Sequence, residues 1–189
     1  MHFFKSIEWD PRSSKSCTFT AFTNTLSIGL GLFLPSSKLV FQCPLPSVSA
    51  SKHIFFFEAL AVCLTFHYFA KWLPNLGCNH LVVYTDSSNT VNIFNFLWAS
   101  TPYNCILISA MDVILDHDID FWVLHVCGMD NPVADAIYHF KNDLAVSLCP
   151  GLVIQNFKPP QDVLGVVQVW CRYLPHPSSP LGLPGHCSS

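Results

Sequence analysis

The chain has 189 residues, of which 51% are hydrophobic and only 11% are charged, and its formal net charge is -3. This length allows one domain with a sizeable core, together with flanking segments. Nine Lys and Arg residues against twelve Asp and Glu residues exclude a strongly basic nucleic-acid-binding protein, because phosphate contacts draw most of their affinity from basic side chains.

The hydrophobic content raises the alternative of a membrane-associated protein. The two longest stretches without a charged residue, 16–37 and 87–111, are interrupted by Thr, Ser and Asn, so neither forms about 20 continuous apolar residues. Lys5 and Glu8 interrupt the N-terminus, which does not resemble a secretory signal. We therefore expect an intracellular protein, in the cytoplasm or the nucleus, that has no membrane partner.

Nine cysteines are spread almost evenly along the chain, and no two of them are separated by two residues. This spacing is typical neither of a zinc site nor of a disulfide framework. We expect the cysteines to be small, reduced and mostly buried hydrophobic residues.

The first part of the chain predicts strands followed by a long helix. Residues 17–43 contain short apolar or alternating runs, and Gly29-Leu30-Gly31 is typical of a turn between two of them. Residues 53–72 are apolar on nearly every face, which predicts a buried central helix that ends at Pro74 and Gly77.

The second part predicts a strand-to-helix unit followed by further elements. Residues 81–84 form a short β-rich run, and Ser87 begins the capping segment of a helix that reaches about Trp98. A helix over 102–115 and a strand over 119–126 follow, and Asn131-Pro132 starts a last helix with Asn as the cap and Pro at the first position. The predicted order is three strands, helix, strand, two helices, strand, helix.

These elements define one predicted α/β domain over residues 17–145. Residues 1–16 are expected to be a peripheral N-terminal segment. Residues 146–189 contain seven prolines and few charges, which predicts an extended, Pro-rich tail.

Three carboxylates stand at positions where chemistry is possible. Glu58 lies in an apolar helix, so it needs a cation, a proton or a hydrogen-bond partner. Asp86 follows a strand, at the edge where α/β sheets present their sites, although it could also cap the next helix. Asp135 falls in the first turn of the last helix, where a negative charge also stabilises the helix dipole.

Two further groups of residues can be interpreted either as ordinary structural residues or as functional ones. The acidic residues around a helix end and strand start are interpreted as a solvated turn rather than a cation site. They are Asp112, Asp116, Asp118 and Asp120, with His117 among them. Four aromatic residues are interpreted as core before any stacking on nucleobases. They are Phe94, Phe96, Trp98 and Trp122.

Four segments in their order and spacing resemble the ribonuclease H domain of retroelement (reverse transcriptase) polyproteins of the fungal type. They are Gly29-Leu30-Gly31, Glu58-Ala59-Leu60-Ala61, Tyr84-Thr85-Asp86 and the run from His125 to Ala136. The segment from Pro150 to Pro160 is similar to the sequence that follows this domain in some of those polyproteins.

The resemblance implies a ribonuclease H-like fold, with a mixed five-stranded sheet whose first three strands are antiparallel and which helices flank. It implies hydrolysis of the RNA strand of an RNA-DNA hybrid with two Mg²⁺ or Mn²⁺ ions. Glu58, Asp86 and Asp135 occupy the metal-ligand positions, and His125 matches the histidine that assists water activation or product release. His125 could equally be an ordinary strand-end residue.

Asn24 departs from the pattern, because the family has an aspartate at this metal-ligand position. Asn keeps the shape of Asp but loses its charge, so we expect nuclease activity to be weakened or lost. The alternative is a noncatalytic remnant that keeps the fold and acts, if at all, as a nucleic-acid or protein binding module. An unrelated membrane-associated protein is the third class, and it rests on the hydrophobic content only.

Overall fold

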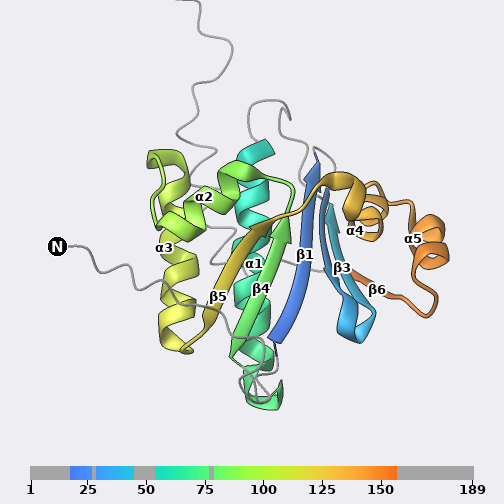
Figure 1. The fold of residues 1–189 in the computed structure, drawn as a ribbon, viewed down its shortest axis with the longest axis horizontal. Helices are drawn as coiled ribbons and strands as arrows, with labels where there is room; N and C mark the ends of the chain where they lie inside the picture. Colours follow the sequence, from blue (N-terminus) through green and yellow to red (C-terminus); the bar gives the residue numbers. More distant parts are fainter. Residues whose placement is uncertain (1–17, 27–28, 45–53, 77–78, 157–189) are drawn as a thin grey trace, which may run out of the picture.

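The computed structural model describes residues 18–26, 29–44, 54–76 and 79–156 (Figure 1). The predicted peripheral segment and most of the predicted Pro-rich tail lie outside the described residues.

A mixed sheet of six strands forms the centre of the described chain, in the order β5-β4-β1-β2-β3-β6. The strands are β1 Thr18–Leu26, β2 Gly29–Leu34, β3 Leu39–Pro44, β4 His80–Thr85, β5 Asp120–His125 and β6 Val153–Asn156. The pairs β1–β2 and β2–β3 are antiparallel, whereas β4 is parallel to β1 and β5 is parallel to β4. The chain therefore has the predicted mixed α/β, ribonuclease H-like fold, with one strand more than the five expected.

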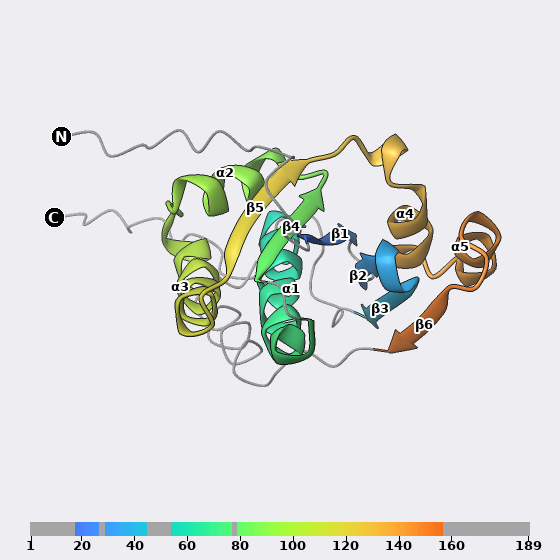
Figure 2. The same ribbon diagram turned by 60° about the horizontal axis from the view of Figure 1, so that its bottom comes forward.

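Helices cover the two faces of the sheet unequally. They are α1 Ile54–Leu76, α2 Ser88–Phe96, α3 Thr101–Asp116, α4 Pro132–Tyr138 and α5 Asn142–Leu148. Helices α1, α2 and α3 lie together on one face, and α4 packs on the other face against β1, β2 and β3 (Figures 1 and 2). Each face has its own cluster of buried apolar side chains.

Helix α1 is the buried central helix that the apolar run predicts. The rings of Phe56, Phe66 and Phe69 are almost fully buried, and the helix packs between the sheet and α3. Residues Ile54–Lys71 are long and apolar enough to span a membrane by length and composition, but 67% of them are buried inside the protein. Packing within the core therefore accounts for the composition of this helix.

Three of the four aromatic residues interpreted as core are exposed, so that interpretation is wrong for them. Phe94 is fully buried, but Phe96 and Trp98 are 71% and 73% exposed because Leu97 ends α2 in the left-handed conformation, with φ of 51°. Trp122 is 44% exposed because alternate residues of β5 face opposite sides, and Phe121 is the one that contacts the core ring of Phe66.

The predicted turn at Gly29-Leu30-Gly31 is wrong, because these residues begin β2. Gly31 serves a close approach between elements instead: a Cβ atom there would lie 3.2 Å from Cγ2 of Ile137 and 3.5 Å from the backbone nitrogen of Tyr138. Gly31 also pairs with Asn24 across β1 and β2. The missing side chain thus lets α4 lie directly over the strand pair that carries Asn24.

The folded elements continue past the predicted boundary at residue 145, which falls inside α5. Leu152 is buried with Phe33 and Val40, and β6 then pairs in parallel with β3, with Val153 opposite Leu39. Strand β6 has only four residues and lies near a proline, so it is too short to show the alternating pattern of a strand in the sequence. The folded part therefore extends at least to Asn156.

We predict that Gly31→Ala destabilises the protein by about 1–3 kcal/mol, because the added methyl group overpacks the contact with α4. Gly128→Ala is the matched control, since its Cβ would meet no atom closer than 3.8 Å. Urea unfolding of both variants measures the difference. Equal stability of the two variants would contradict this role of Gly31.

Candidate functional site

The register of three parallel strands brings the predicted site residues to one edge of the sheet. Phe22 of β1 pairs with Tyr84 of β4. Asn24 and Asp86 each follow two residues later, so they lie at the same height along the two neighbouring strands. Thr85 pairs with His125, the last residue of β5, which places this histidine beside Asp86. The carboxyl ends of β1, β4 and β5 therefore meet at one edge.

Two helices add a carboxylate each from either side of this edge. Glu58 lies in the second turn of α1, where the hydroxyl of Ser87 lies near enough to lower the pKa of its carboxyl group. Asp135 lies in the first turn of α4. Besides burial, the charge of Asp86 raises the pKa of Glu58, and the charge of Asp135 raises the pKa of Asp86. Asp86 is thus the centre of the cluster.

Burial is the main cause of the raised pKa values of Glu58 and Asp86. The pKa of Glu58 is raised by burial, lowered by the nearby hydroxyl of Ser87 and raised by the charge of Asp86. The pKa of Asp86 is raised by burial and by Asp135, and lowered by a backbone hydrogen bond and by His125. The charged form of each carboxylate is therefore less favourable than in water, and a nearby positive charge would offset this cost.

Two buried carboxylate oxygens, Oε2 of Glu58 and Oδ1 of Asp86, have no hydrogen-bond partner in the described part of the chain. A divalent cation that prefers oxygen ligands, such as Mg²⁺ or Mn²⁺, would satisfy them and neutralise the repulsion. The donor set therefore fits such an ion. Within the described residues, however, no three His, Cys, Asp or Glu side chains lie close enough together to share one ion. The structure therefore provides pairs of carboxylates that share Asp86, rather than a group of three around one ion.

Asp86 does not have the capping role that its sequence position also allowed. Ser87 is the N-cap of α2, and its hydroxyl oxygen accepts a hydrogen bond from the backbone N–H of Thr90 at 3.3 Å. The carboxylate of Asp86 instead faces the 3₁₀ turn at Gly128–Asp130, since a Cβ on Gly128 would lie 3.8 Å from its Oδ2 atom.

Asn24 is buried, with 4% of its surface exposed, and its Oδ1 atom accepts a hydrogen bond from the backbone N–H of Thr25 at 2.7 Å. The amide oxygen thus has a partner within the strand. Asn24 adds no negative charge beside Asp86, so the cluster holds three carboxylates where the resemblance predicts four.

Tyr138 is a residue of this region that sequence reasoning missed. Its hydroxyl donates a hydrogen bond to Oδ1 of Asp135 at 2.9 Å, and its side chain is buried. Burial and the neighbouring Asp135 raise the pKa of Tyr138 to about 12, so the phenol stays protonated at neutral pH. Its position three residues after Asp135, on the same helical face, is the signal that could have identified it.

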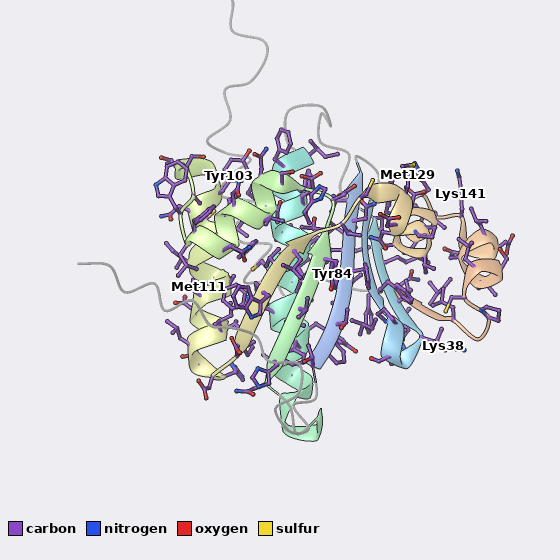
Figure 3. All side chains as sticks on the ribbon, in the orientation of Figure 1. Lys38, Tyr84, Tyr103, Met111, Met129 and Lys141 are labelled. Carbon is purple, nitrogen blue, oxygen red and sulfur yellow. The ribbon has the colours of Figure 1, made fainter. Side chains whose placement is uncertain are left out.

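A groove with a volume of about 250 Å³ adjoins the cluster. It is lined by aromatic, amide, hydroxyl and small side chains: Phe55, Asn89, Asn92, Ile93, Phe96, Trp98, Ala99, Ser100 and Tyr103. Figure 3 shows Tyr103 at the end of α3 beside α2. Burial and then the charge of Glu58 raise the pKa of Tyr103, which places the groove next to the carboxylates.

The second acidic group is separate from this cluster. Asp112, Asp116, Asp118 and Asp120 are exposed, and Asp120 begins β5 whereas His125 ends it. Oδ2 of Asp120 lies 2.9 Å from Nδ1 of His80. These residues therefore lie at the opposite edge of the sheet.

Comparisons with known proteins do not decide the family of this chain. No protein-family model and no curated protein matches the chain. Among solved structures, it is similar to the crystal structure of RNase H1 from the halophilic archaeon Halobacterium salinarum NRC-1, with 14% sequence identity and a TM-score of 0.48. The match covers 67% of this chain and 98% of the archaeal chain. The strand order and register of this chain carry the assignment of its fold.

We predict that Glu58→Gln and Asp86→Asn each stabilise the metal-free protein at pH 7, by about 0.5–2 kcal/mol. Because the folded-state pKa of each group is raised, its contribution to stability is complete below the unfolded pKa and is lost as pH rises through the folded pKa. The gain should therefore shrink as pH falls towards about 4. Denaturant unfolding across this pH range measures it.

Asp112→Asn, which removes an exposed carboxylate of α3, is the control. It should change stability little at any pH in this range. A loss of stability at pH 7 in both Glu58→Gln and Asp86→Asn would contradict the proposed strain among buried carboxylates.

Proposed function

We propose that this chain is a ribonuclease H-type domain, derived from a retroelement reverse transcriptase polyprotein, whose activity on RNA-DNA hybrids is weakened or lost. The observation that supports this function best is the convergence of Glu58, Asp86 and Asp135 on one sheet edge, where two buried carboxylate oxygens have no partner among the described residues.

Mg²⁺ or Mn²⁺ is the cofactor that this donor set fits. Glu58 and Asp86 would hold one ion and Asp86 with Asp135 a second, since Asp86 interacts with both. When bound, such ions activate water and stabilise the leaving oxygen of a phosphodiester. His125 is exposed beside Asp86, and in this proposal its ring exchanges a proton between the reacting oxygens and solvent.

Asn24 is the reason to expect weak activity. It lies level with Asp86 on the adjacent strand, but it is neutral and its Oδ1 atom already accepts the Thr25 N–H. A divalent ion at this edge therefore has one anionic ligand fewer to bind it. Changes to groups that only support metal ligands cost about 10- to 100-fold, and loss of a ligand charge should cost at least as much.

The groove beside Glu58 supports a nucleic-acid substrate. It combines exposed aromatic rings, which stack on nucleobases, with amide and hydroxyl groups that can form hydrogen bonds to base edges. Among the residues that the structure describes, no lysine or arginine lines it. Stacking rather than phosphate binding would then supply the affinity, and binding should depend only weakly on salt.

A noncatalytic remnant is the second candidate. The internal hydrogen bond of Asn24, and the absence of three metal-binding side chains close together among the described residues, favour it. In this case the groove would make the chain an intracellular nucleic-acid binding module without a membrane partner, and a protein partner is the other possibility.

Asn24→Asp should increase Mg²⁺- or Mn²⁺-dependent cleavage of a labelled RNA-DNA hybrid by at least about 10- to 100-fold over the unmodified chain, because it restores the missing charge. The double variant Asn24→Asp with Asp86→Asn is the control and should cleave no better than the unmodified chain. If Asn24→Asp folds but does not cleave, the nuclease proposal fails and the remnant is favoured.

Trp98→Ala should weaken binding of a fluorescent single-stranded RNA by roughly 5- to 100-fold, which corresponds to the loss of about 1–3 kcal/mol from one stacked base. Trp122→Ala is the matched control, since it removes an exposed tryptophan from β5, outside the groove. Fluorescence anisotropy without divalent ions measures both. Equal affinities of the two variants would exclude the groove as the binding surface.

A further inference from the structure

We propose that Tyr138 is a positioning residue that orients the carboxylate of Asp135 for metal binding, an inference that rests on the proposed function. The two residues lie three positions apart in α4, so their side chains project from the same face of the helix. The hydroxyl of Tyr138 donates to Oδ1 of Asp135 at 2.9 Å.

The rest of the tyrosine is held firmly in place. Its side chain is 7% exposed, and its ring lies 4.3 Å from the ring of His139 between centroids. Gly31 has its Cβ position 3.6 Å from Cβ of Tyr138, so the strand backbone sits against this residue. A fixed ring gives its hydroxyl a fixed position, and the hydroxyl then limits rotation of the Asp135 carboxylate.

This contact links Asp135 to the strand that carries Asn24. Gly31 pairs with Asn24 in β1 and β2, and it packs against Tyr138, which binds Asp135. The contacts that join Asn24 to Asp135 run through Gly31 and Tyr138, which are both buried. The position of Asp135 relative to the sheet edge is therefore set by the glycine contact and the tyrosine hydrogen bond together.

The hydrogen bond also determines how Asp135 can bind a cation. Because one lone pair of Oδ1 accepts the hydroxyl of Tyr138, Oδ2 would be the oxygen of Asp135 that is presented to a metal ion. A carboxylate oriented by such a partner binds metal more tightly than one that rotates freely, and loss of the partner typically costs about 10- to 100-fold in affinity.

The test is Mn²⁺ binding to the full chain, measured by electron paramagnetic resonance of the free ion, in both the unmodified and the Asn24→Asp protein. Tyr138→Phe removes only the hydroxyl, and it should weaken Mn²⁺ binding about 10- to 100-fold. Tyr84→Phe is the matched control, since its ring stacks on Phe22 with 4.8 Å between centroids and it lies outside the cluster. It should leave Mn²⁺ affinity unchanged.

Two further measurements distinguish a role of Tyr138 in orienting Asp135 from a purely structural role. Circular dichroism establishes the temperature at which every variant is folded, and Mn²⁺ binding is measured there. In the Asp135→Asn background, Tyr138→Phe should cause no further loss of affinity. Equal Mn²⁺ binding with Tyr or Phe at position 138 overturns this inference and leaves the proposed function intact. Failure of both parent proteins to bind Mn²⁺ overturns the proposed function and this inference with it.

Discussion

Burial of carboxylates at one sheet edge, to which their mutual repulsion adds, is the constraint on which the site depends. Asp86 follows β4, Glu58 reaches it from α1, and Asp135 reaches it from α4, so three elements on two faces of the sheet add negative charge at one place. Burial and repulsion act together on these groups, because low exposure both removes water and weakens the screening of their charges. A cation relieves both effects at once, which is why such an arrangement favours metal binding over stability.

Asn24 has two opposite consequences under this constraint. It removes a charge from the level of Asp86, which lessens the repulsion in the metal-free protein, and its amide oxygen is satisfied by the Thr25 N–H within the strand. The same change lowers the negative charge available to hold an ion. Under the proposed function, weaker metal binding and lower electrostatic strain would therefore have one cause, the neutral side chain of Asn24.

Local patterns in the sequence predicted most of the fold and the candidate carboxylates, because they depend on periodicity and on strand or helix ends. The apolar run of α1 and the strand that leads to Asp86 are of this kind. Gly31 was misread, because its role depends on a contact with Tyr138 more than a hundred residues later. Trp98 was misread because Leu97, a residue without any turn signal, ends α2 in a left-handed conformation.

The register between β1 and β4 likewise sets Asn24 at the same height as Asp86. This register cannot be predicted from either segment alone. The hydrogen bond of Tyr138 required the helix to be placed, although the spacing from Asp135 was visible. Long-range pairing, rather than local propensity, thus decides the details of the site.

Paramagnetic broadening of backbone amide signals by substoichiometric Mn²⁺ tests the central claim most directly. The described part of the chain has acidic residues at opposite edges of the sheet, one group centred on Asp86 and another over Asp112–Asp120. The account predicts that the signals of Asp86, Gly128 and the residues beside Glu58 broaden first and that those around Asp118 persist. Broadening around Asp118 alone, or none at either edge, would contradict a metal site at the carboxylate cluster.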